Sequence, residues 1–367
     1  MDSFRSVIMP APGAPLEVIS TAFPKLEPGA MLLEVHLAEV CGTDVHLHHG
    51  RLSGVPYPLV PGHVCVGAIA DLNGEVKDIY GHTFGVGDLV TFLDVHETCG
   101  NCWHCLVGKN STRCPSRKVY GITYGQQDGP LGGWAEYVYL KPGVQAIRLP
   151  RELSADTFIG GGCGAPTAYH AVERSGLRMN DTVVVQGTGP VGLSAIAFAR
   201  IRGAGQIIAI GAPQDRCFLA LAMGADQALN FEEVPESQRL DIIRSITNGR
   251  GADVVIEATG SPAAIVEGMN LTRDAGTYLV VGQYTDNGET SMNPHLHLNR
   301  KHLNLLGCWG SDYSHFSGAI QTMARYQEKI PWRELAKWRY SLDRAAQALD
   351  DIQERRVPKA VLNVIHI

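Results

Sequence analysis

A glycine-rich turn between an expected strand and an expected helix is the strongest constraint on how this chain folds. The turn reads Gly187-Thr188-Gly189-Pro190-Val191-Gly192, directly after the apolar run 182–186 and at the start of a helical stretch that ends near Arg202. In this setting the first glycine makes the tight turn, the second lets the backbone approach a pyrophosphate, and the third lets helix and strand pack closely. The helix N-terminus then faces the anion. The sequence therefore predicts that this turn binds a dinucleotide.

The residues around this turn alternate between strand-like and helix-like segments. Further apolar runs at 206–210, 253–257 and 277–281 are separated by helical or glycine-containing stretches. This alternation is typical of a parallel, doubly wound sheet. Between about Leu32 and Leu149 the pattern consists of short apolar runs broken by glycine and proline, which indicates a β-rich region. We therefore expect an α/β protein with a β-rich domain and a doubly wound, Rossmann-type domain.

The residue at the end of the second strand of this sheet bears on the choice of coenzyme. A carboxylate is expected there, about 20 residues after the turn, to accept the ribose hydroxyls of NAD. This sequence has Gly211 instead, which removes the repulsion that would reject the 2′-phosphate of NADP. The first cation after it is Arg216, which is alternatively a solvated residue of the first helical turn. The choice between NAD and NADP therefore stays open. NAD is slightly preferred, because the 2′-phosphate of NADP normally takes more than one cationic or hydroxyl partner.

Four cysteines are clustered in one short segment, at Cys99, Cys102, Cys105 and Cys114. Four thiolates fill the tetrahedral shell of a structural Zn²⁺, and such a site holds a loop by metal bonds rather than by hydrophobic burial. One alternative is four unrelated free thiols. Another is a zinc ribbon for nucleic acid, but the chain has 31 Lys and Arg against 37 Asp and Glu, a net charge of −6. A nucleic-acid partner is therefore not expected.

A second set of metal-ligating residue types is spread more widely, at Cys41, His63 and Cys163. Two thiolates and one imidazole leave a fourth position open for water or substrate, which distinguishes a catalytic zinc from a structural one. Taken singly, Cys163 is equally well explained as a small buried residue, and His63 as a satisfied polar residue. The spacing alone leaves these alternatives open.

Together these motifs resemble the zinc-dependent medium-chain dehydrogenase/reductase family, which includes alcohol, sorbitol and threonine dehydrogenases, over essentially the whole chain. The resemblance implies a GroES-like β-rich catalytic domain at 1–162, with a structural zinc lobe at about 95–116. It also implies a Rossmann coenzyme-binding domain at 163–302 and a return to the catalytic domain at 303–367. By position, Cys41, His63 and Cys163 match the ligands of the catalytic zinc, and the four clustered cysteines match those of the structural zinc.

The resemblance also assigns roles to residues that bind no metal. Thr43 matches the hydroxyl that contacts the substrate oxygen, His46 the distal end of a proton relay, and Asp44 the partner that orients a ligand histidine. Lys359 falls where the family often places a basic residue near the coenzyme pyrophosphate, although a surface lysine is an alternative. The family usually has Glu after the ligand histidine, whereas this chain has Val64.

The activity implied is hydride transfer between an alcohol and NAD(P), which gives a ketone or aldehyde. Apolar residues in segments that border the family's substrate cleft favour a secondary alcohol that is bulky or cyclic, although core packing explains each equally well; they are Leu59, Val95, Trp134 and Trp309. One alternative is a zinc-free quinone or enoyl reductase of the same superfamily, which has no need of the metal residues. Another is a non-enzymatic nucleotide-binding protein, which leaves the Thr43 and His46 relay unexplained.

Composition limits the other partners. The most apolar stretches, 193–201 and 206–212, are too short for a membrane helix, and no secretory leader is visible at the N-terminus. Nine cysteines do not resemble the disulfide framework of a small secreted domain. We therefore expect a cytoplasmic enzyme that acts on a small molecule, with no membrane partner. The family resemblance further implies a homodimer or homotetramer.

Overall fold

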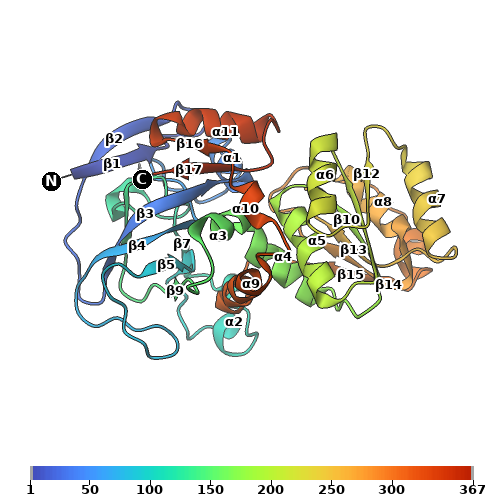
Figure 1. Cartoon of the computed structure of the whole chain (residues 1–367), viewed down its shortest axis with the longest axis horizontal. Helices are drawn as coiled ribbons and strands as arrows, with labels where there is room; N and C mark the ends of the chain where they lie inside the picture. The colour runs from blue at the N-terminus through green and yellow to red at the C-terminus, as the bar shows by residue number, and fades with distance from the viewer. Residues whose placement is uncertain (1–2, 365–367) are drawn as a thin grey trace. The chain divides into compact units, whose positions relative to one another are not determined.

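The computed structural model describes residues 3–364, which form two compact units (Figure 1). Unit 1 comprises the chain up to Cys163, then 312–327 and the chain from Trp332 onward, and unit 2 comprises 164–311 and 328–331. The return from unit 2 was predicted at 303 but occurs at Asp312. The difference arises because strand β15 (Asn304–Gly307) pairs with β14 (Thr272–Val280) and so extends the sheet of unit 2.

Unit 1 is built on a seven-stranded sheet in which β3 (Met31–Val40) is central. This strand pairs antiparallel with β4 (Cys65–Leu72), β8 (Tyr137–Leu140) and β17 (Ala360–Asn363). Seven of the ten residues of β3 are apolar, and eight of the ten are buried, because side chains pack against both of its faces. The sheet is completed by β5 (Leu89–Phe92), β9 (Ala146–Arg148) and β16 (Arg339–Tyr340). Two separate two-stranded sheets are formed by β1 (Ser3–Ile8) with β2 (Glu17–Ala22) and by β6 (Val95–His96) with β7 (Lys118–Val119). The helices are α1 (Gly42–His48), α2 (Trp103–Leu106), α3 (Ala155–Gly161), α9 (Tyr313–Tyr326), α10 (Trp332–Leu335) and α11 (Ala345–Gln353), with short 3₁₀ turns at Ser111–Arg113, Gln126–Asp128 and Leu342–Arg344.

Unit 2 is a parallel six-stranded sheet in the order β12-β11-β10-β13-β14-β15. Its strands not yet introduced are β10 (Thr182–Gln186), β11 (Gln206–Gly211), β12 (Gln227–Asn230) and β13 (Ala252–Glu257). Its helices are α4 (Gly164–Arg174), α5 (Pro190–Arg202), α6 (Gln214–Ala222), α7 (Glu236–Ile246) and α8 (Ala263–Leu271), with a π-helical turn at His295–Asn299. Helices α5 and α6 lie on one side of the sheet and α7 and α8 on the other (Figure 1). The expected α/β architecture, a β-rich domain with a doubly wound one, is confirmed.

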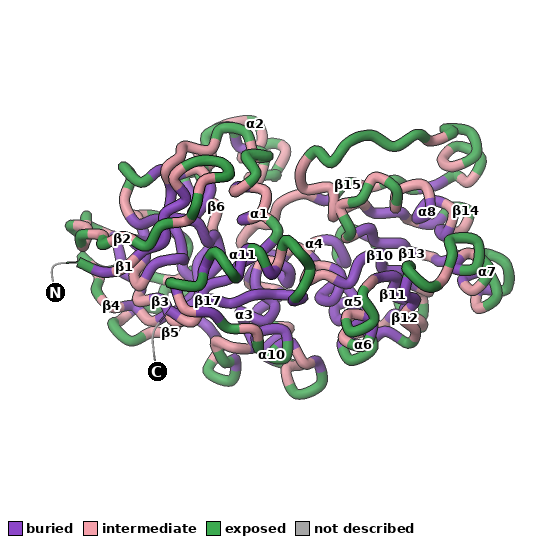
Figure 2. Tube along the Cα trace, turned by 90° about the horizontal axis from the view of Figure 1, so that it is seen from above, coloured by how far each residue is buried: buried purple, intermediate pink, exposed green. Residues whose placement is uncertain are grey.

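The strands that the sequence predicts for unit 2 are buried on both faces, as a sheet covered on both sides requires. The three central valines of β10 have no exposed surface, and β10, β11 and β13 are the buried centre of the unit in Figure 2. Within residues 3–364, none of the helices combines the length and the apolar character that a bilayer crossing needs.

Candidate active site

Three side chains of metal-ligating types, from distant parts of the sequence of unit 1, come together in the fold. One sulfur each from Cys41 and Cys163 and one ring nitrogen of His63 lie within 4.8 Å of one another. Cys41 follows β3, His63 precedes β4, and Cys163 follows α3. Cys41 and His63 are buried and Cys163 is half-buried. Two sulfurs and one nitrogen are donors that Zn²⁺ prefers, and three protein ligands leave its fourth position open.

Local backbone structure places Cys41 and two residues of the predicted relay. Cys41 is the N-cap of α1, and its sulfur accepts a hydrogen bond from the Thr43 backbone N–H at 3.3 Å. Asp44 Oδ2 in turn accepts the Cys41 backbone N–H at 2.8 Å, which closes a capping box. Thr43 and His46 are three positions apart on α1 and so share one face of the helix.

The predicted role of Asp44 in orienting a ligand histidine has no hydrogen bond to support it. Among the described residues, neither Asp44 Oδ1 nor His63 Nδ1 has a hydrogen-bond partner, although both atoms are buried. The other Asp44 oxygen is engaged by the cap of α1. The charge of Asp44 still acts on His63, as does that of Asp94, a half-buried carboxylate that the sequence did not single out.

The protonation of the three side chains is strongly coupled. A hydrogen bond between the two thiols raises the pKa of Cys41 and lowers that of Cys163. Burial disfavours the charged form of His63, but contact with Cys163 and the nearby carboxylates outweigh it and raise the His63 pKa to about 10. A metal ligand must be deprotonated, so binding of a metal ion here would release protons.

A buried ion pair lies against this centre, and the sequence did not reveal it. Glu39 Oε2 accepts a hydrogen bond from the Cys163 backbone N–H at 2.6 Å. Glu39 Oε1 accepts a hydrogen bond from Lys359 Nζ. Lys359 is therefore fully buried in unit 1, and the alternative of a surface lysine is wrong. Its ammonium is engaged by Glu39, and its predicted role at the coenzyme pyrophosphate stays a prediction. The signal in the sequence was a single glutamate two positions before Cys41, within an otherwise apolar strand end.

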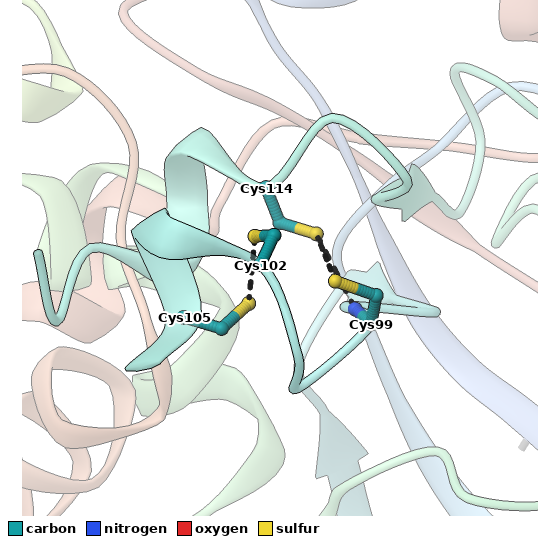
Figure 3. Close-up of side chains that lie close together, drawn as sticks. All are labelled: Cys99, Cys102, Cys105 and Cys114. Atoms are coloured by element: carbon teal, nitrogen blue, oxygen red, sulfur yellow. Dashed lines mark hydrogen bonds between the residues drawn. The ribbon is translucent and has the colours of Figure 1, made fainter. Parts of the chain in front are cut away.

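The four clustered cysteines converge around α2 in unit 1 (Figure 3). The sulfurs of Cys102 and Cys105 are 3.6 Å apart, as are those of Cys99 and Cys114. The Cys99 backbone N–H donates to the Cys114 sulfur at 3.3 Å and lowers the pKa of that thiol to about 6. Four converging sulfurs match a closed tetrahedral Zn²⁺ shell.

In unit 2 the glycine turn leaves space where a dinucleotide phosphate would lie. Gly187 has a φ of +107°, and a Cβ there would lie 2.6 Å from the Ala258 carbonyl oxygen. A Cβ at Gly192 would overlap the Gly187 carbonyl, so α5 and β10 pack closely only with glycine. A Cβ at Gly189, the N-cap of α5, would meet nothing within 4 Å. The N-terminal end of α5 begins with Pro190 and Val191. It is therefore free to receive an anion.

The end of β11 explains why this chain has glycine where a carboxylate is expected. A Cβ at Gly211 would overlap the side chain of Thr188, which is buried beneath it. Thr188 belongs to the glycine turn, so the turn itself fills the space that an acidic side chain would need. Arg216 lies half-buried in the first turn of α6.

Residues that the sequence suggested for a substrate pocket lie in two different settings. Trp134 and Leu59 have no exposed surface and belong to the packed interior of unit 1. Core packing, the alternative considered for them, is therefore correct. Val95 packs against a small apolar cluster of unit 1, and Trp309 stacks on Tyr284 in unit 2 at a ring separation of 5.7 Å.

Two family models match this chain. Residues 27–151 match the alcohol dehydrogenase GroES-like domain, and residues 190–325 match the zinc-binding dehydrogenase domain. The 5-exo-hydroxycamphor dehydrogenase of Pseudomonas putida is 32% identical over 338 residues, which are 92% of each protein. The chain belongs to the zinc-type alcohol dehydrogenase family. The resemblance noted from the motifs is thereby confirmed.

Other members of the zinc-type alcohol dehydrogenase family agree with this assignment. An NAD-dependent alcohol dehydrogenase of Sulfurisphaera tokodaii is 31% identical over 282 residues, covering 74% of this chain and 76% of that protein. The crystal structure of an alcohol dehydrogenase from Thermotoga maritima matches with a TM-score of 0.94 and 32% identity, over 99% of this chain and 100% of the other. The family thus favours an NAD(P)-dependent dehydrogenase of alcohols over a zinc-free reductase or a non-enzymatic protein.

Proposed function

We propose that this chain interconverts a secondary alcohol and its ketone, with one zinc at the Cys41, His63 and Cys163 centre and a second at the four-cysteine lobe. The observation that carries this proposal is the convergence of two sulfurs and one imidazole nitrogen within 4.8 Å. This set of three donors leaves a coordination position for substrate. The lobe, with four donors, offers no such position, so its role is structural.

The chemistry needs groups that move a proton, and α1 supplies two of them. When bound, zinc supplies a Lewis acid for the alcohol oxygen and NAD(P) supplies the hydride acceptor. The Thr43 hydroxyl accepts the alcohol proton as it releases its own proton toward His46, so that the hydroxyl stays neutral. Burial, with the nearby charge of Arg51, lowers the pKa of His46, so its imidazole is neutral at pH 7 and can accept a proton.

The preferred coenzyme in this proposal is NAD. Arg216 is the first cation after β11, and a 2′-phosphate normally takes more than one such partner. The NAD-dependent relative from Sulfurisphaera tokodaii supports the same choice. A fluorescence titration of the purified protein with NADH and NADPH tests it: tighter NADH binding is expected, whereas tighter NADPH binding would contradict it and assign Arg216 to the phosphate.

The preferred substrate in this proposal is a bulky or cyclic secondary alcohol. The support is the relative named 5-exo-hydroxycamphor dehydrogenase, since a hydroxycamphor is a cyclic secondary alcohol. Turnover with a series of linear and cyclic secondary alcohols measures the preference. We also propose a cytoplasmic homodimer or homotetramer, supported by the family resemblance, and sedimentation equilibrium measures its mass.

Replacing one ligand of the proposed catalytic zinc tests the function. The Cys163→Ala variant should lose alcohol-dependent reduction of NAD(P) and one zinc per chain, while the four lobe cysteines keep theirs. Cys65→Ala is the matched control, because Cys65 is a fully buried thiol of unit 1 outside both metal groups. It should keep both zinc ions and activity. Wild-type turnover by Cys163→Ala would overturn the assignment.

A further inference from the structure

A carboxylate and an ammonium are both completely buried beside the proposed catalytic centre. Glu39 is 1% exposed and Lys359 is 0% exposed. They lie on neighbouring segments, because Glu39 on β3 pairs in register with Val361 on β17. Charged groups are almost never fully buried unless paired, and removing two charges from water costs much of what their attraction returns. The pair is therefore weakly explained by stability alone.

The pair contacts the loop that carries Cys163. Glu39 uses its two oxygens differently: Oε2 accepts the Cys163 backbone N–H at 2.6 Å, and Oε1 lies 3.6 Å from the Cys163 sulfur. The loop passes directly over the pair at Gly162, which has a φ of +50°. A Cβ at Gly162 would overlap both the Glu39 carboxylate and the Lys359 ammonium. The conformation of the loop at Gly162 and the positions of the Glu39 and Lys359 side chains therefore depend on each other.

Charge balance explains why the lysine accompanies the glutamate. Two thiolates already cancel the charge of one Zn²⁺, so an additional carboxylate would leave the buried centre with an excess negative charge. Lys359 Nζ donates a hydrogen bond to Glu39 Oε1, which is the same oxygen that lies near the Cys163 sulfur. The ammonium thus cancels the carboxylate charge at the atom nearest the thiolate.

We propose that Glu39 is a positioning residue for the Cys41, His63 and Cys163 centre, and that Lys359 is the counter-ion that allows its carboxylate to lie there. Glu39 fixes the Cys163 backbone, and so the direction of its sulfur, through a charge-assisted hydrogen bond. This inference rests on the proposed zinc-dependent function. Partners of this kind typically change metal affinity by about 10–100-fold, because they orient the ligand rather than bind the metal.

The experiment measures zinc affinity at the centre by competition with a chelator, with the lobe zinc of the same chain as internal reference. A second readout is the thiolate-to-metal absorption band after cobalt replaces zinc at the centre. Glu39→Ala should weaken zinc binding at the centre by about 10–100-fold and leave the lobe unchanged. If this variant does not fold, the double variant Glu39→Gln/Lys359→Met tests the proposal instead. It removes both charges and keeps a neutral acceptor for the Cys163 N–H.

The double variant should bind zinc at the centre about 10-fold more weakly and show a shifted cobalt band, since the hydrogen bond to Cys163 is no longer charge-assisted. The matched control is Glu267→Gln/Arg239→Met, which removes a buried ion pair of unit 2. It should keep wild-type zinc affinity at both sites. Wild-type affinity and an unchanged cobalt band in Glu39→Gln/Lys359→Met would overturn the positioning role and leave the proposed function standing. A native chain that binds no metal at the centre would overturn both.

Discussion

At the scale of single residues, burial decides which side chains can do chemistry. His46 lies in the last turn of α1, where burial lowers its pKa and keeps its imidazole neutral at pH 7. A neutral imidazole accepts a proton, whereas a group that stayed charged could not. The same effect at His63 is outweighed by contact with Cys163 and the carboxylates around it. Their surroundings therefore shift the pKa values of these two histidines of unit 1 in opposite directions.

Replacing His46 with glutamine should slow turnover without removing metal. We expect kcat to fall by about 100-fold, the lower end of what a general base contributes. In the native chain kcat should also fall as pH drops through the His46 pKa, because the imidazolium form cannot accept a proton. The His46→Gln variant should lack this dependence. A profile of kcat against pH measures both, and identical profiles for the two proteins would exclude His46 from the relay.

A carboxylate cannot simply be added at Gly211. Its Cβ would overlap Thr188, so Gly211→Asp should destabilise unit 2 by about 1–3 kcal/mol, the usual cost of overpacking. Shortening the neighbour in Thr188→Gly/Gly211→Asp should recover most of this loss, since the space is then free. Chemical denaturation of the three proteins measures the effect. A single variant as stable as the native chain would show that Thr188 does not block the position.

The convergence of the candidate metal ligands could be predicted from the sequence, but the buried Glu39–Lys359 pair next to them could not. Cysteine and histidine at these positions carry the family resemblance, and the structure brings Cys41, His63 and Cys163 together. Glu39 and Lys359 are 320 residues apart, and nothing in a lone glutamate or lysine indicates that both are buried. Such pairs are set by packing between distant segments, which the local pattern does not contain.

At the scale of elements, helix α9 shows how a short polar motif fixes the return of the chain to unit 1. Asp312 is its N-cap and accepts the Ser314 backbone N–H at 2.9 Å, while His315 Nδ1 accepts the Asp312 backbone N–H at 3.0 Å. This capping box defines where the helix begins. The contact of Asp312 Oδ1 with the His315 ring nitrogen Nδ1 at 3.0 Å, with further hydrogen bonds from Ser314, holds the pKa of the Asp312 carboxyl well below its usual range.

Removing this cap should destabilise unit 1 in a pH-dependent way. We expect Asp312→Ala to cost about 1 kcal/mol at pH 7, as for other N-cap replacements. The folded pKa lies below the unfolded value of about 4, so the contribution is complete above that pH and is lost as pH falls below it. Urea denaturation of both proteins at several pH values measures the difference. A constant difference down to acidic pH would contradict an ionised cap.

The strands of unit 2 differ in how well the sequence predicted them. Strands β10, β11 and β13 are near-continuous apolar runs because they are buried on both faces. Strand β15 is a short edge strand whose four residues have exposed or half-buried positions, so it lacks this signal. The predicted end of the domain at 302 missed this strand for that reason.

At the scale of the whole molecule, unit 1 contains two groups of candidate metal ligands in opposite settings. The three-ligand centre lies among buried side chains, whereas none of the residues 97–113 of the lobe is buried (Figure 2). A segment without a hydrophobic core is held by its metal, because metal binding supplies the folding free energy. In the proposed function, zinc at the lobe would therefore stabilise structure, and zinc at the centre would be the one available for chemistry.

The most direct test of this account is to remove zinc selectively from the three-ligand centre and to measure alcohol-dependent reduction of NAD(P). A site with three protein ligands should release its zinc to a chelator before the closed four-cysteine site does. We expect activity to disappear while about one zinc per chain remains, and to return when one equivalent of zinc is added back. Full activity in protein whose centre holds no metal would contradict the zinc-dependent function.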